Sequence, residues 1–204
     1  MRGGATLGWL LFVLALGIGG GARAEEIEVH NASLLAGEEN LLLSADFNFE
    51  LRPRLAEWVA NGVPLHFVVE FDLKRTRWWW FDEKTASRRL QLRLSYHALS
   101  RSYRLSSGLL QQNYPSLEEA LNVLRRLRGW VVAERGLLQP DALYQASVRM
   151  RLDTSQLPRP FQLSALTSRD VTLESGWARF EYRPLPLPVA APPEPREFPE
   201  EPPR

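Results

Sequence analysis

Residues that could perform acid–base, metal or nucleophilic chemistry are sparse in this 204-residue sequence. The three histidines, His30, His66 and His97, lack the spacing of a metal site within one helix or strand, although His66 and His97 could meet across a hairpin. Serine nucleophile motifs and phosphate-binding glycine loops are absent, and so is cysteine. The sequence therefore predicts no catalytic residue, no metal site and no cofactor.

Carboxylates are abundant, but the clearest ones alternate with apolar residues along expected strands. Asp46, Glu50, Glu70 and Asp72 fall on the solvent-facing parity of these strands, where they would serve solubility. Paired carboxylates for glycoside hydrolysis are compatible with this pattern, so a hydrolase of cell-envelope glycan stays an alternative. We expect a protein that is not an enzyme.

The most unusual stretch has four large aromatic residues in succession, between residues 75 and 84. Successive side chains of a strand point to opposite faces, so the four cannot all enter one core. Exposed indoles bind sugars or peptides, partner proteins or membrane interfaces, whereas buried ones would close the core beneath a flanking arginine. The predicted binding surface consists of Arg75, Arg77, Trp78, Trp79, Trp80 and Phe81.

Alternation of apolar and polar residues predicts the elements that must position this stretch. Strands are expected at residues 27–29, 41–51, 65–73, 90–98, 101–105, 109–113, 130–133 and 144–152, with helices from Pro53 to about Asn61 and from Ser116 to about Gly129. Residues 81–87 would connect a long hairpin, on which Glu70 and Asp72 could pair with Arg89 and Arg93 in solvent. The two prolines within residues 157–161 predict an extended crossing between strands. These elements indicate a mainly β (α+β) fold, an antiparallel sandwich-like sheet with two short helices.

The amino terminus reads as an export signal. Arg2 is followed by an apolar run over residues 7–18 and by small residues up to Ala24, after which cleavage is expected. A retained membrane anchor is the alternative, but the run is shorter than the roughly 20 residues that span a bilayer. We therefore expect a periplasmic or secreted protein without an integral membrane segment after cleavage.

Composition divides the chain into residues 1–24 (signal peptide), 25–183 (one antiparallel β-rich domain) and 184–204 (a disordered proline-rich tail). The tail holds nine of the fifteen prolines. Beyond the signal, 23 basic and 24 acidic residues remain, a balance that argues against nucleic acid as a partner.

Several segments together resemble the bacterial family catalogued as domain of unknown function 4390. They are residues 62–65 (Gly-Val-Pro-Leu), the strand that runs into residues 77–80 (Arg-Trp-Trp-Trp), residues 94–99 (Leu-Ser-Tyr-His-Ala-Leu), 148–153 (Val-Arg-Met-Arg-Leu-Asp) and 157–161 (Leu-Pro-Arg-Pro-Phe). The resemblance covers about residues 26–183 and implies an exported bacterial envelope protein, encoded near sensor histidine kinases of the nitrogen-regulation type. It brings no established activity and therefore no functional residues.

Taken together, these observations predict an exported, non-catalytic binding module with an envelope protein as partner, accessory to an envelope sensor system. A glycan hydrolase and a purely structural exported domain are the alternatives. The sequence leaves the oligomeric state open.

Overall fold

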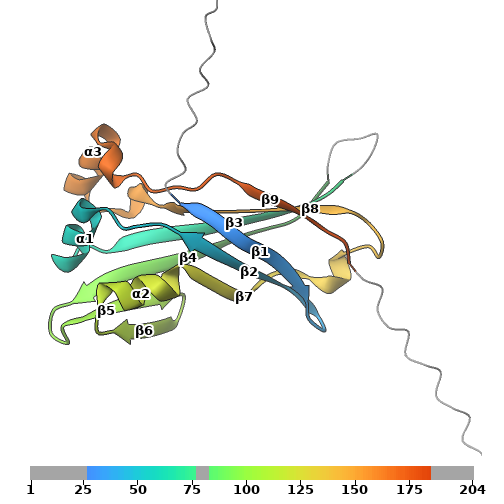
Figure 1. The fold of residues 1–204 in the computed structure, drawn as a ribbon, viewed down its shortest axis with the longest axis horizontal. Coiled ribbons are helices and arrows are strands. Elements are labelled where there is room, and N and C mark those ends of the chain that lie inside the picture. Colours follow the sequence, from blue (N-terminus) through green and yellow to red (C-terminus); the bar gives the residue numbers. More distant parts are fainter. Residues whose placement is uncertain (1–26, 77–82, 185–204) are drawn as a thin grey trace, which may run out of the picture.

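Two antiparallel sheets pack face to face in the computed structural model, which describes residues 27–76 and 83–184. Within these residues the smaller sheet has the order β1-β2-β7 and the larger one the order β6-β5-β4-β3-β8-β9 (Figure 1). The smaller sheet comprises β1 (Glu28–Ala36), β2 (Asn40–Asn48) and β7 (Arg126–Glu134). The larger comprises β3 (Leu65–Arg75), β4 (Glu83–His97), β5 (Ser102–Ser107), β6 (Leu110–Tyr114), β8 (Tyr144–Leu152) and β9 (Ala178–Tyr182). The predicted mainly β, antiparallel fold is confirmed.

The core lies between the two sheets, because every second residue of the central strands is apolar and points inward. Leu43 and Phe47 on β2 and Phe67 and Phe71 on β3 belong to one core cluster, and all four are almost fully buried. Burial of such a side chain contributes roughly 1.5–3 kcal/mol. The alternating apolar residues that predict these strands therefore also stabilise the sandwich, because they are the residues buried between its sheets.

Helices α1 (Pro53–Ala60) and α2 (Leu117–Leu124) begin where their sequence signals predict. Pro53 occupies the first turn of α1, where no backbone N–H donor is required, and Gly62 follows the helix with a φ of 87°. At α2 the Ser116 hydroxyl accepts a hydrogen bond from the Glu119 backbone N–H at 3.2 Å. Pro53 therefore marks the start of α1, and the Ser116 cap marks the start of α2.

The predicted end of the second helix is wrong, since α2 stops at Leu124 and residues from Arg126 onward form β7. The Phe47 N–H donates to the Arg125 carbonyl, and β2 then pairs with β7, so the sheet takes residues whose spacing also suits a helix. The predicted strand at residues 130–133 is correspondingly longer. The first strand also extends beyond residues 27–29, because β1 runs to Ala36 along β2.

A third helix, α3 (Arg159–Thr167), replaces the extended crossing predicted around Pro158 and Pro160. Pro158 is its N-cap and Pro160 lies in its first turn, where the missing N–H has no cost. Phe161 packs edge-on against Trp58 of α1, with ring centroids 4.8 Å apart. Short 3-10 turns, η1 (Arg135–Leu137), η2 (Thr154–Gln156) and η3 (Arg169–Val171), complete the connections.

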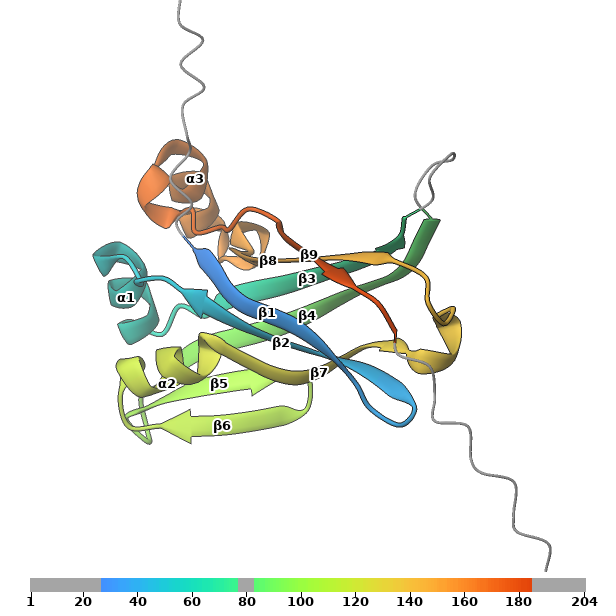
Figure 2. The same ribbon diagram turned by 45° about the vertical axis from the view of Figure 1, so that its right-hand side comes forward.

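The β3–β4 hairpin is longer than predicted, because β4 begins at Glu83 and not near Arg89. Residues 83–87 are therefore strand and not connection, and a bulge opposite Leu73 and Lys74 accommodates the extra residue. The helices lie at one end of the sandwich, and the end of β3 and the start of β4 lie at the other (Figures 1 and 2). No helix among the described residues is long and apolar enough to cross a membrane.

Candidate functional site

The predicted binding surface is described only at its first residue, Arg75. Arg77, Trp78, Trp79, Trp80 and Phe81 lie outside the described residues. Arg75 is the last residue of β3, where it pairs with Glu83 of β4 on one side and with Tyr144 of β8 on the other. It occupies the core-facing parity of β3, two residues after the buried Leu73, as the alternation predicts.

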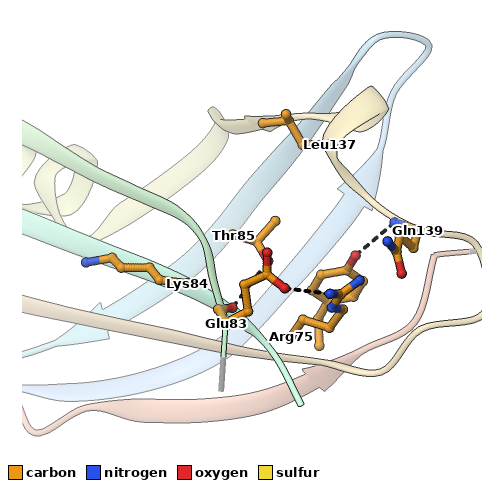
Figure 3. A pocket seen from close by; sticks show the side chains of 7 residues that line it. Arg75, Glu83, Lys84, Thr85, Leu137 and Gln139 are labelled. Atoms are coloured by element: carbon orange, nitrogen blue, oxygen red, sulfur yellow. Dashed lines mark hydrogen bonds and ion pairs between the residues drawn. The ribbon is translucent and has the colours of Figure 1, made fainter. Parts of the chain in front are cut away.

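A pocket of about 220 Å³ opens around Arg75 at this end of the sandwich (Figure 3). Its walls come from four places in the chain: the end of β3, the start of β4, the segment that includes η1, and the start of β8. The lining residues are Arg75, Glu83, Lys84, Thr85, Leu137, Gln139 and Tyr144. The pocket is therefore mostly polar, with one aliphatic side chain at its rim.

Arg75 is held in the pocket by an ion pair with Glu83, between Nη2 and Oε2 at 2.5 Å. Its side chain is largely buried, and the Thr76 N–H next to it donates to the Leu143 carbonyl at 3.0 Å. Charge-assisted hydrogen bonds of this kind orient a guanidinium firmly. Arg75 is thus a fixed donor group and not a free surface side chain.

Tyr144 forms a buried part of the pocket wall. Its ring is almost fully buried, and its hydroxyl oxygen accepts a hydrogen bond from the Gln139 backbone N–H at 2.8 Å. The Gln139 side chain lines the pocket beside it, and Leu137 is 53% exposed at the rim. The segment between η1 and β8 is therefore fastened to the sheet at the place where the pocket opens (Figure 3).

The pocket is suited to hydrogen bonding. Glu83 is the single carboxylate among its lining residues, and it is engaged by Arg75. Glycoside hydrolysis needs two carboxyl groups facing each other, an arrangement that these lining residues do not provide. Lys84 extends away from the other lining side chains (Figure 3). It pairs with Asp72 at 3.0 Å.

The hypothesis that His66 and His97 meet across the hairpin is wrong. His66 lies opposite Arg93, whereas His97 lies opposite Ser102 of β5. Burial, and then the nearby Arg93 guanidinium, lower the pKa of His66. In the part of the chain that the structure describes, no three His, Asp or Glu side chains gather as metal ligands.

The predicted hairpin ion pairs are partly correct. Glu70 does lie opposite Arg89, but it is 5% exposed and not solvent-facing, because Arg149 of β8 contacts it from the other side at 2.5 Å. Asp72 lies opposite Ser87 and not Arg93. Desolvation alone would raise the pKa of Asp72, but hydrogen bonds to its carboxylate from Ser87 and Lys84 lower it below its ordinary value.

Most of the pocket residues carry no signal in the sequence. Tyr144 shares the parity of the buried residues on its strand and reads as core, and Gln139 and Leu137 lie in a segment without a motif. A signal exists only for Arg75, because the phase of its strand places it on the core face beyond the last apolar residue.

Comparison with known proteins identifies the family. A search of curated proteins and a search of solved structures each found no match. The family model described as "Domain of unknown function (DUF4390)" matches residues 24–181, which is most of the chain and includes the pocket. The chain therefore belongs to the DUF4390 family, as the resemblance predicts.

Proposed function

We propose that this protein is an exported, non-catalytic binding module that receives one side chain or chain terminus of an envelope protein in the pocket around Arg75. The main support for this proposal is the volume of the pocket. Sites for whole small molecules measure about 300–1,000 Å³, whereas this pocket measures about 220 Å³. It suits a single protruding group of a larger partner.

The chemistry of the lining favours a partner group that accepts hydrogen bonds. The Arg75 guanidinium, the Thr85 hydroxyl and the Gln139 amide can all donate, while Leu137 offers an apolar contact at the rim. A carboxylate or a carbonyl on an aliphatic stem would match this set. The aromatic residues 78–81 begin three positions after Arg75 in the sequence, and aromatic side chains are typical of protein-binding surfaces.

Site-specific photocrosslinking in the envelope tests the binding role. A crosslinker at Leu137 should capture one defined partner, and capture should fall at least fivefold when Thr85→Val and Gln139→Ala are combined. Gln91→Ala is the control, since Gln91 is exposed on β4 away from the pocket. Equal capture by wild type and the pocket variant would refute the proposed site.

A second double substitution tests whether the aromatic stretch contributes to binding. Trp78→Ala combined with Trp80→Ala should remove the same crosslinked partner while leaving the folded domain intact by circular dichroism. An unchanged partner set would exclude these residues from the contact surface.

Export is tested separately, by recovering the protein from the envelope fraction and sequencing its amino terminus. We expect Glu25 as the first residue of the mature chain, because the small residues before it are typical of signal cleavage. Recovery only from the cytoplasm would contradict the localisation.

A further inference from the structure

The strand β6 is an unprotected edge of the larger sheet. Edge strands present unpaired backbone groups, and proteins protect such edges with charges, prolines, bulges or a covering element. β6 has the sequence Leu-Gln-Gln-Asn-Tyr, without a charge or a proline, and Gln111, Gln112 and Asn113 are all exposed. The hairpin β5–β6 pairs without a register shift.

The other edge strands of the described residues all carry a protective feature. The opposite edge of the same sheet, β9, contains Arg179 and Glu181. In the smaller sheet, β1 has a bulge between His30 and Ser33, and β7 pairs with β2 through two register shifts. The lack of protection at β6 is therefore specific to this edge.

The backbone groups on the open side of β6 can be assigned from the turn. Gly108, with a φ of 57°, forms with Leu109 a two-residue turn, whose flanking residue Leu110 directs its N–H back to β5. Successive residues of an antiparallel strand direct their N–H and C=O to alternate sides. Gln111 and Asn113 therefore present these groups to the open side.

The edge is complementary to itself. If two β6 strands pair antiparallel about a two-fold axis at Gln112, Gln111 of each copy lies opposite Asn113 of the other, and both form hydrogen-bonded pairs. The same register places Leu110, which is 75% exposed, beside Tyr114 of the second copy. This register uses the open backbone groups and covers the exposed leucine at once.

We propose that two copies of this chain associate through their β6 edges and join their larger sheets into one continuous antiparallel sheet. The inference goes beyond the proposed function, since the Arg75 pocket lies at the ends of β3, β4 and β8, and β5 separates even β4 from β6 in the sheet order. The contact is short, with one five-residue strand from each copy. The dimer should therefore form in the micromolar to millimolar range and exchange freely.

Charge variants at the paired positions test the register. In Gln111→Lys/Asn113→Lys, each lysine lies opposite a lysine of the second copy, and the dimer is disfavoured. In Gln111→Lys/Asn113→Glu, each lysine lies opposite a glutamate, and the dimer is favoured. Both variants alter the same two exposed positions, and both lose the hydrogen bond that Asn113 Oδ1 accepts from Arg104 Nε at 3.0 Å within the protomer. The dissociation constants should differ roughly 30-fold because two such pairs form per dimer.

Sedimentation velocity over a concentration series is the measurement. Wild type should show a concentration-dependent dimer, the Lys/Lys variant a monomer at the same concentrations, and the Lys/Glu variant a tighter dimer. A third variant, Gln111→Pro, removes the backbone N–H that points to the open side of β6 and leaves the hydrogen bonds from β6 to β5 intact. It should also weaken the dimer. A wild-type monomer up to millimolar concentration, or equal dissociation constants for the two charge variants, would overturn the proposal.

Discussion

Glu70→Gln should destabilise the protein more than any other single charge removal on the same strand. The Glu70 side chain is 7% exposed at the centre of the larger sheet. Arg149 contacts its Oε2 through Nη2 at 2.5 Å and Nε at 2.6 Å, and Arg89 contacts its Oε1 at 3.1 Å. Glutamine keeps the size and removes the charge that holds these guanidiniums, so β4, β3 and β8 lose an ion-pair network that spans them.

The size of this destabilisation depends on how exposed Arg149 and Arg89 are. Breaking a buried ion pair by removing one member costs roughly 3–5 kcal/mol, because the other charge is left unpaired. Arg149 and Arg89 are 32% and 73% exposed, so both can regain part of their hydration and the cost is smaller. We expect a loss of about 2 kcal/mol, which lowers the Tm by about 4–8 °C in a domain of this size.

Asp72→Asn is the matched control, since it removes the same charge from the same strand and the same sheet face. Asp72 is 23% exposed and pairs with Lys84 at 3.0 Å, so its loss should cost about 0.5 kcal/mol. Urea unfolding followed by tryptophan fluorescence measures both variants. Equal free energies of unfolding for the two variants would refute the reasoning that burial makes the Glu70 network different from a surface pair.

Three further predictions concern the histidine, a cap and a turn. Because the pKa of His66 is lowered in the folded state, folding disfavours its protonated form. Its contribution to stability is fully present above the ordinary value of 6.5 and falls as pH decreases below that value. His66→Gln should make this fall shallower in urea midpoints measured against pH, and an unchanged slope would exclude His66 as the cause. Ser116→Ala removes the N-cap acceptor of α2 and should cost about 1 kcal/mol of unfolding free energy, whereas Ser116→Asp should retain stability. Gly62→Ala places a side chain at a φ of 87° and should cost about 1 kcal/mol or more, although no atom lies close enough to clash; a neutral effect would show that the turn relaxes.

Local patterns in the sequence predict the elements well. The strand at residues 144–152 has the predicted bounds, because one buried face imposes strict alternation over its whole length. The starts of α1 and α2 follow from Pro53 and Ser116, which act within one turn of the helix. Predictions failed where pairing with a strand distant in sequence determines the secondary structure. Arg126, for example, pairs with Asp46 of β2 and is therefore in a strand and not in the predicted helix.

The burial of Glu70 could not be predicted, because it depends on which strands are neighbours. Alternation places Glu70 on the outward parity and correctly places Arg89 opposite it in the local hairpin. That β8 lies on the other side of β3 is set by a pairing between residues about 80 positions apart, and periodicity carries no information about it. Arg149 therefore reads as an exposed residue in the sequence and as an ion-pair partner in the structure.

Some residues of the pocket stabilise the end of the larger sheet, whether or not a ligand binds there. A strand that extends beyond its core must satisfy polar groups at the core boundary. The ion pair of Arg75 with Glu83 and the hydrogen bond from Gln139 N–H to Tyr144 serve that purpose without any ligand, although Arg75 Nε stays buried without a hydrogen-bond partner among the described residues. Substituting these groups would confound stability with binding.

Three other lining side chains contribute little to holding the sheet together. The Gln139 side-chain amide makes no hydrogen bond within the described ranges, and the Thr85 hydroxyl has only a 3.5 Å contact with the Glu83 carbonyl. Leu137 remains half exposed although the core lies near it. Folding gains little from these three side chains, so a loss of partner capture on changing Thr85 and Gln139 would report on the pocket and not on the stability of the sandwich.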